Sequence, residues 1–242
     1  MYSKNILFVI PVIVIAVLIG VIYMDSLDRA SAPGEALQDA NHQHTNQSSY
    51  APEPDAGDMQ RILEIEQQLD TLQNENLAVA FYGELVQIYL NNDRLDGAAD
   101  ASARMAELTG DFKDWKNAAD WFHQRLLDEE NEEYVHYYAG KSIEMYEHAL
   151  TIEPFHAEVK TDVAVEYMRI GQPAPAIRHL EEVLAENPDF LTANFNLGVI
   201  FHQMGNKDKS ISYLNRSLEL AEGSDYEAVV REFLQHSEIQ TQ

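Results

Sequence analysis

Histidines and carboxylates are the residues that could carry chemistry in this chain of 242 residues. His42 and His44 lie close together in a polar stretch, but stable metal sites need three or four ligands and no third one is nearby. The other histidines are scattered without ligand spacing: His123, His136, His148, His156, His179, His202 and His236. No Gly-rich phosphate loop, His-Glu-x-x-His motif or Ser-centred elbow occurs. We therefore predict no catalytic residue, no metal site and no cofactor, and hence a protein that is not an enzyme.

Composition narrows the classes of partner further. The chain has 41 acidic and 16 basic residues, a formal net charge of -25, which would repel the phosphate backbone of a nucleic acid. The absence of cysteine excludes disulfides, thiolate metal sites and a cysteine nucleophile. With 45% apolar residues the chain can bury one sizeable core, so we expect one folded domain with appended segments.

The amino terminus has the composition of a membrane anchor. Residues 6–24 form an uncharged run of nineteen residues, long enough as a helix to cross a hydrocarbon core of about 30 Å. Lys4 precedes this run and two aspartates follow it, so residues 1–5 are expected in the cytoplasm and the bulk of the chain on the periplasmic or other extracytoplasmic side. The alternative is a signal peptide cleaved after Ala30-Ser31-Ala32, which the length of the apolar run disfavours.

A polar linker follows the predicted anchor. Residues 25–58 are rich in Ala, Ser, Asn, Gln, His, Pro and acids, with almost no large apolar side chains. Such a segment cannot offset the entropy lost on ordering, so we predict a disordered acidic linker.

A period of 34 residues organises the rest of the chain, and residues 157–190 and 191–224 match each other most clearly. The first block contains Val163, Ala164, Tyr167, Gly171, Ala176, Leu180, Val183 and Pro188, and the second contains Leu197, Gly198, Phe201, Gly205, Ser210, Leu214 and Ser217 at the same positions. Each block predicts two helices joined by a glycine turn. The small residues Ala164 and Gly198 allow the two helices to approach closely.

Further elements flank the two clear repeats. Ser142, Tyr146, Ala149 and Pro154 fit the second helix of a repeat over 112–156, whose first helix, around Trp115 and Phe122, lies eleven residues too early. We therefore predict an insertion over 128–138 and a further degenerate repeat over 77–111.

The two ends of the repeat region predict one helix each. Residues 59–76 are expected to form a leading helix that packs on the first repeat, or alternatively a short coiled coil with Asn76 at a core position. The seam positions alternate three and four residues apart: Ile62, Ile65, Leu69, Leu72, Asn76 and Val79. Ser224 to Glu227 has the pattern of a capping box and begins a predicted capping helix over 224–238.

The two clear blocks resemble tetratricopeptide repeats, which carry Leu-Gly-x-x-Tyr in a first helix and Ala, a large apolar residue, Ala and Pro in a second. The resemblance implies an all-α helical-hairpin solenoid of about three to four repeats over residues 77–222. It also implies that a peptide or helix of a partner binds on the concave face of the first helices. The positions that map onto this face are Glu158, Thr161, Val165, Met168, Arg169, Thr192, Phe195, Val199, His202 and Gln203.

The expected function is a membrane-tethered scaffold that binds a protein partner, with assembly of an envelope complex as one such role. Met168 and Phe195 are the expected anchors for partner side chains, Arg169 is expected to meet a carboxylate, and Arg169 with His202 could form a small polar site. One alternative is a homo-oligomer that self-associates through the leading helix and the solenoid surfaces. A narrower one is similarity to the repeat-containing subunits of cytochrome c maturation, which present apocytochrome.

Overall fold

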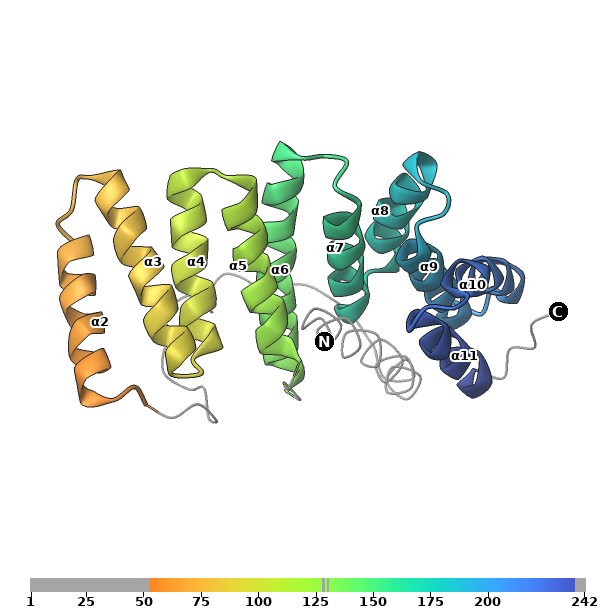
Figure 1. Cartoon of the computed structure of the whole chain (residues 1–242), viewed down its shortest axis with the longest axis horizontal. Coiled ribbons are helices and arrows are strands. Elements are labelled where there is room, and N and C mark those ends of the chain that lie inside the picture. Colours follow the sequence, from red (N-terminus) through yellow and green to blue (C-terminus); the bar gives the residue numbers. More distant parts are fainter. Residues whose placement is uncertain (1–52, 128, 130, 238–242) are drawn as a thin grey trace.

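The computed structural model describes residues 53–127, 129 and 131–237, and every regular element in this part of the chain is an α-helix (Figure 1). The predicted anchor over 6–24 and the predicted linker up to residue 52 lie outside the described residues. Among the helices that are described, none has the length and apolar character needed to cross a bilayer.

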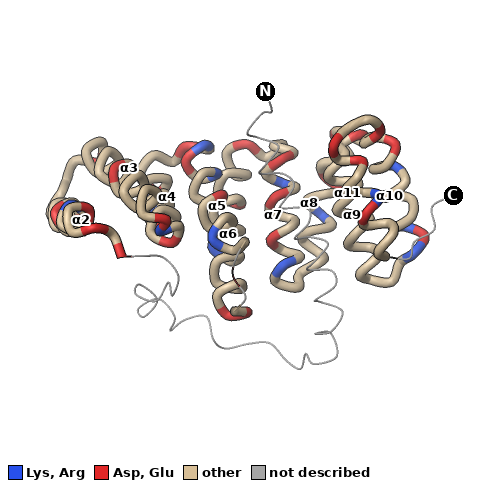
Figure 2. The backbone as a smooth tube through the Cα atoms, turned by 60° about the horizontal axis from the view of Figure 1, so that its bottom comes forward, with Lys and Arg blue, Asp and Glu red and all other residues tan. Residues whose placement is uncertain are grey.

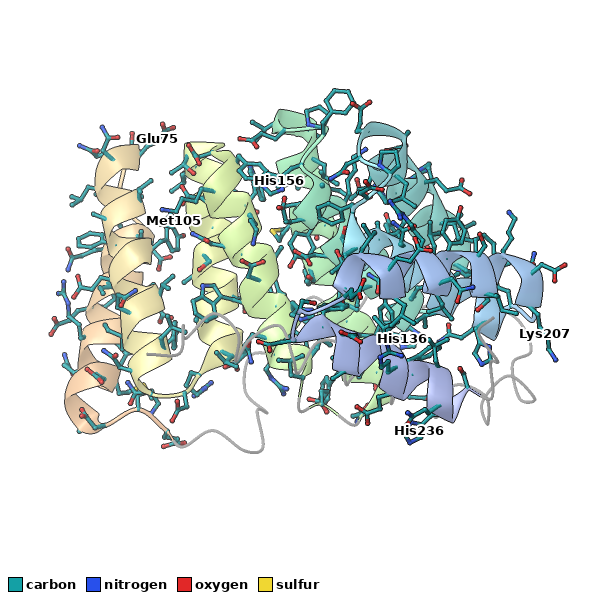
Figure 3. The ribbon with its side chains drawn as sticks, turned by 45° about the vertical axis from the view of Figure 1, so that its right-hand side comes forward. Glu75, Met105, His136, His156, Lys207 and His236 are labelled. Carbon is teal, nitrogen blue, oxygen red and sulfur yellow. The ribbon has the colours of Figure 1, made fainter. Side chains whose placement is uncertain are left out.

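The described helices stack side by side as antiparallel hairpins, with one extra helix at each end of the stack (Figure 1). The bounds are α2 Ala56–Leu69, α3 Glu75–Asn91, α4 Leu95–Thr109, α5 Phe112–Leu126, α6 Glu132–Ile152, α7 Ala157–Arg169, α8 Pro173–Glu186, α9 Leu191–Gln203, α10 Lys207–Ala221 and α11 Tyr226–His236. The hairpins are α3–α4, α5–α6, α7–α8 and α9–α10. Glu75 and His156, at the starts of α3 and α7, mark one end of the helices, and His136, early in α6, lies toward the other (Figure 3).

Small residues set the close packing within a hairpin, as the sequence predicts. A Cβ added to Gly198 would lie 2.6 Å from Leu214 Cγ, so only glycine fits at this contact between α9 and α10. The Ser210 hydroxyl donates to the Gly198 carbonyl at 2.8 Å and satisfies a buried polar group there. Gly171 and Gly205 join the helices of their hairpins with φ of 71° and 73°, a left-handed conformation that favours glycine.

Helix α6 corrects the prediction of an insertion over 128–138. Residues 132–138 form the first two turns of this helix, which begins where the Asn131 side chain accepts a hydrogen bond from Glu133 N at 2.9 Å. Tyr138, at the end of these turns, lies under the Arg125 guanidinium and beside the Phe122 ring of α5. The extra residues therefore lengthen a helix because their apolar side chains find partners on α5.

Helix α2 packs on the first hairpin as a leading helix. Ile62 and Ile65 are buried in a cluster that includes Leu85 and Val86 of α3. A single coiled-coil helix through Val79 does not form, because α2 ends at Leu69 and a connection separates it from α3. The Asp55 side chain caps α2, so the predicted linker extends three residues too far.

Helix α11 closes the other end of the stack. Its buried residues Val230, Phe233 and Leu234 form one cluster with Phe195 of α9 and Leu214 of α10, which confirms the predicted capping helix. The predicted capping box does not form. Glu227 accepts a hydrogen bond from Gly223 N at 2.9 Å and not from Ser224 N, and the Ser224 hydroxyl donates to the Ala221 carbonyl instead of capping α11.

Candidate protein-binding face

The predicted groove residues lie on α7 and α9, the first helices of their hairpins, and three of them are buried: Thr161, Phe195 and Val199. The Phe195 ring centroid lies 6.0 Å from that of Tyr226 and 5.7 Å from that of Phe233. The structure thus corrects the expectation that Phe195 anchors a partner side chain. The reason is that α11 packs on the side of α9 where the first helix of a further repeat would lie.

The predicted polar pair of Arg169 and His202 does not form. The side chain of Arg169 is 7% exposed, and its Nε lies 3.1 Å from Glu166 Oε2. Arg169 is therefore already paired with a carboxylate of its own helix. The His202 ring meets the Phe233 ring edge to face at 5.7 Å. Burial lowers the pKa of His202, and the charge of Lys207 lowers it further, which leaves a neutral ring at pH 7.

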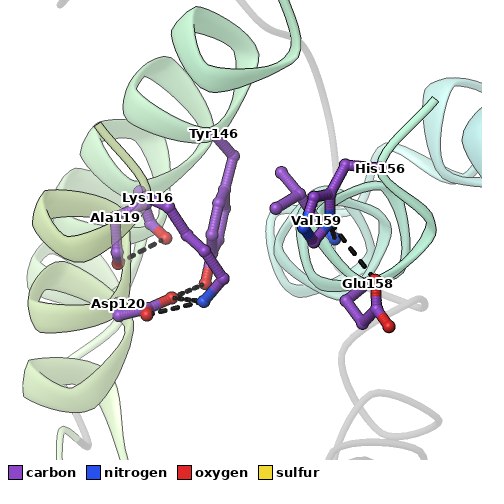
Figure 4. Close-up of polar contacts among 8 residues, drawn as sticks. Lys116, Ala119, Asp120, Tyr146, His156, Glu158 and Val159 are labelled. Atoms are coloured by element: carbon purple, nitrogen blue, oxygen red, sulfur yellow. Dashed lines mark hydrogen bonds and ion pairs between the residues drawn. The ribbon is translucent and has the colours of Figure 1, made fainter. Parts of the chain in front are cut away.

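The remaining predicted groove residues are exposed or half-buried. Glu158 is exposed and forms an ion pair with His156, the cap of α7, at 3.3 Å (Figure 4). Met168 is half-buried against the cluster around Leu180 and Leu197. Val165, Thr192 and Gln203 are half-buried. These five residues are the predicted positions that a partner could still reach.

A row of charged residues lies on the facing sides of α5 and α7, the first helices of their hairpins. We name it the α5/α7 polar strip, and it consists of Lys116, Asp120, His123, Asp162, Glu166 and Arg169. Its charges are close to balanced, in contrast to the chain as a whole.

Asp120 is held at one edge of the α5/α7 polar strip. Lys116 Nζ, one turn earlier on α5, lies 2.7 Å from Asp120 Oδ2, and the buried Tyr146 hydroxyl of α6 donates to Asp120 Oδ1 at 2.9 Å (Figure 4). Burial raises the pKa of Tyr146 well above its ordinary value, so the hydroxyl keeps its proton and remains a donor. The carboxylate of Asp120 is thereby fixed in position with 41% of its side chain exposed.

Glu166 joins α5 to α7 through a buried carboxylate. His123 Nδ1 lies 2.5 Å from Glu166 Oε1, while Arg169 holds the other oxygen. Burial alone would raise the pKa of Glu166, but the charges of His123 and Arg169 outweigh it and hold the pKa below the usual range. For His123 the effects are reversed. Burial alone would lower its pKa, but the charge of Glu166 outweighs burial and raises the pKa. A buried charge paired on two sides can be accommodated in this way.

Asp162 lies between these two pairs and differs from both. Burial raises its pKa to about 7, with Lys116 and His123 opposing the shift and Asp120 and Glu166 adding to it. Within the described part of the chain, no hydrogen bond or ion pair holds its carboxyl group. Asp162 is therefore a half-buried acid that is near its midpoint of ionisation at neutral pH and has free hydrogen-bonding capacity.

The groove positions inferred from the sequence include no residue of α5, although the sequence contains a signal for the positions on that helix. Lys116, Asp120 and His123 lie 45 residues before Thr161, Val165 and Met168, which equals one repeat period plus the eleven-residue displacement. Applying that displacement to the groove positions would have placed these three residues on the first-helix face. The contacts across to Asp162 and Glu166 could not be deduced this way, since those positions were not assigned to the face.

Comparisons with known proteins agree with this architecture. Residues 162–225 match the family model of the tetratricopeptide repeat. A thermophilic tetratricopeptide repeat protein of Thermus thermophilus is similar over 74% of this chain and 89% of that chain, with 14% identity and a TM-score of 0.52. A tetratricopeptide repeat protein from Parabacteroides merdae is similar over 73% and 68%, with 14% identity and a TM-score of 0.50. MamA is similar over 66% and 86%, with 16% identity and a TM-score of 0.49.

These comparisons establish the fold class. Residues 162–225 match the tetratricopeptide repeat model, and the described helices together form an all-α solenoid of that fold. At 14% identity the solved structures share the fold alone with this chain. No curated protein matches it.

Proposed function

We propose that this protein is a scaffold that binds a segment of a partner protein along the α5/α7 polar strip. A tetratricopeptide repeat solenoid is suited to protein–protein interaction, and the resemblance to this family implies that the first helices line the binding surface. The observation that carries the proposal is Asp162, a half-buried carboxyl group without a hydrogen bond or ion pair within the described residues, flanked by charged pairs. A hydrogen bond from a partner's donor to such a carboxyl group would stabilise the complex.

The chemistry of the strip indicates what the partner segment carries. A lysine or arginine side chain placed against Asp162 would favour its ionised form and would also approach Asp120, which is half-exposed. Glu158, one turn before Asp162 on α7, is exposed and extends the acidic surface in the same direction. The proposed ligand is thus an extended or helical segment with a basic side chain at its centre.

Membrane tethering is part of the proposal and rests on the sequence of residues 6–24. An anchor there, followed by a polar spacer, would confine the solenoid to one membrane surface on the extracytoplasmic side. Tethering raises the effective concentration of the solenoid for partners in the same membrane. A groove with modest affinity would then suffice.

A charge reversal in the strip tests the proposal. The full chain, cross-linked in its native envelope, would be compared with Asp162→Lys and with Glu181→Lys, a matched change on the exposed side of α8. The expected result is loss of the cross-linked partner with Asp162→Lys and retention with Glu181→Lys. Equal capture of every partner by all three proteins would show that the strip is not the binding site.

A further inference from the structure

One side of α2, together with its C-cap residue Asp70, carries four side chains at successive helical turns. Met59, Leu63, Glu66 and Asp70 follow one another at spacings of four, three and four residues, which places them on one face of the helix. Met59 is 36% exposed and Leu63 is 49% exposed, and both acids are exposed. We name these four residues the α2 stripe. Its first half is apolar and its second half is acidic.

The α2 stripe is not the face by which α2 packs on the stack. That face carries Ile62 and Ile65, which are 5% and 0% exposed, together with Leu69. Helix α2 comes before the first helix of a hairpin and therefore has the place of a second helix in the series (Figure 1). Each later second helix packs against the first helix of its own hairpin. The described residues contain no such first helix before α2. One side of α2 thus lacks the neighbour that the repeat architecture supplies elsewhere.

The carboxylates of the α2 stripe have the capacity to receive charged donors. The ion pairs on this helix connect Arg61 with Glu64 and with Glu84 of α3, away from the stripe. No hydrogen bond or ion pair within the described part of the chain engages the side chain of Glu66 or Asp70. In Figure 2 the tube of α2 carries acidic positions, in red, beside a basic one, in blue.

Residues 25–52, which precede α2, and a second copy of the chain both lack the chemistry to cover the stripe, and the proposed function assigns residues 6–24 to the membrane. Residues 25–52 contain Leu27, Leu37 and Tyr50 as their large apolar side chains, and their spacing gives no apolar pair on adjacent helical turns. A second copy would bring another net charge of -25 and another acidic α2. Like charges placed opposite each other in such a contact oppose association.

We propose that the α2 stripe docks an amphipathic helix of a partner protein. This helix presents an apolar pair to Met59 and Leu63 and a basic pair to Glu66 and Asp70. Because neighbouring helices in the stack run antiparallel, its basic pair precedes its apolar pair in sequence, at the spacing of four, three and four residues. The docked helix takes the place of a first helix for α2, a helix-in-groove mode of recognition that is separate from the α5/α7 polar strip.

A designed peptide can stand in for the unidentified partner. The probe is a fluorescently labelled, alanine-based helix of about 18 residues that carries two lysines and then two leucines at that spacing. A second peptide has glutamates in place of the lysines. Anisotropy titrations with the full chain are expected to show binding of the lysine peptide about tenfold tighter than binding of the glutamate peptide.

Variants separate the stripe from other surfaces. Leu63→Glu should abolish binding of the lysine peptide, whereas Leu108→Glu, a matched change at an exposed leucine of α4, should leave it unchanged. Glu66→Lys combined with Asp70→Lys should reverse the preference toward the glutamate peptide. Asp162→Lys should have no effect, which distinguishes a failure of this proposal from a failure of the proposed function.

Three outcomes would overturn the proposal. The first is equal binding of the two peptides, or unchanged binding by Leu63→Glu. The second is a concentration-dependent dimer of the full chain, seen by sedimentation, that Leu63→Glu dissociates, because a second copy would then cover the stripe. The third is a lack of maleimide reaction at Leu63→Cys in the monomeric full chain. Since the chain has no cysteine of its own, such protection would show that the chain covers its own stripe.

Discussion

At the scale of single residues, two helical glycines with opposite surroundings separate packing from backbone effects. A Cβ at Gly198 would meet Leu214 at 2.6 Å, with the Leu214 backbone nitrogen at 3.2 Å, so the hairpin must open to accept it. A Cβ at Gly140, on the exposed side of α6, would meet nothing within 4 Å. We expect Gly198→Ala to lower the free energy of unfolding by about 1–3 kcal/mol and Gly140→Ala to raise it by about 0.5–1 kcal/mol.

Urea unfolding of the full chain, followed by circular dichroism, would measure both changes. The difference in sign is the informative result, because the two substitutions add the same methyl group. A stabilising Gly198→Ala would mean that α9 and α10 are not in close contact.

The raised pKa of Asp162 predicts how the stability of the fold depends on pH. Its pKa is about 7 in the folded chain against 3.8 as the ordinary value, so the folded state binds this proton more tightly and stability falls as pH rises from about 4 to 7. The raised pKa of His123 acts in the same direction, since its stabilisation is present below pH 6.5 and is lost as pH rises through the folded-state pKa. Glu166 acts oppositely, because its lowered pKa stabilises the fold above pH 4.5 and this stabilisation is lost on acidification.

Asp162→Asn should therefore flatten the pH dependence of stability between about 5 and 8. The amide cannot ionise, so we expect the gain in stability from this substitution to be about 2–3 kcal/mol larger at pH 8 than at pH 5. Thermal unfolding at the two pH values, with Glu158→Asn as a control at an exposed acid of the same helix, would measure the difference. An unchanged slope would show that Asp162 is ionised in the folded chain.

At the scale of elements, α11 stabilises the last hairpin by covering the first-helix face of α9. Phe233 is 6% exposed and its ring lies 5.7 Å from those of both Phe195 and His202. Phe233→Ala should lower stability by about 3–5 kcal/mol, as expected for a large-to-small change in a core. Because contacts in a solenoid are made between neighbours, the loss should appear as faster hydrogen exchange in α9 and α10 while α3 to α6 remain protected. The exposed neighbour Glu232→Ala should change neither region.

The elements could be predicted from the sequence where a local pattern is strong. Gly171, Gly205 and Pro188 fixed the turn positions and helix ends of the clear repeats, since left-handed glycines and proline restrict the backbone directly. The extra turns of α6 were not predictable, because acidic residues such as Glu132 and Glu133 suit a loop or the first turn of a helix equally, and Tyr138 decides the outcome by packing on α5. The burial of Phe195 also depends on tertiary contact, with a helix about thirty residues later.

The candidate site shows the same division between local and long-range information. The period placed Thr161 to Arg169 on the correct helix, but it could not show that Arg169 is neutralised by Glu166 three residues before it. Glu166 is fully buried and its first oxygen faces His123 of α5, a contact that links residues 43 apart in the chain. Only the approach of α5 to α7 reveals that this part of the first-helix face is ionic.

At the scale of the whole molecule, the proposed anchor makes a prediction about sidedness that the lack of cysteine renders easy to test. Ser3→Cys and Ser237→Cys each introduce a single thiol, one on either side of residues 6–24. With Lys4 holding the amino terminus in the cytoplasm, an impermeant maleimide added to intact cells should label Ser237→Cys and leave Ser3→Cys unlabelled until the cells are lysed. Ser237 is the C-cap residue of α11 and lies outside the four hairpins. Labelling of Ser3→Cys alone would reverse the orientation, and release of the protein from membranes by alkaline carbonate would contradict the anchor itself.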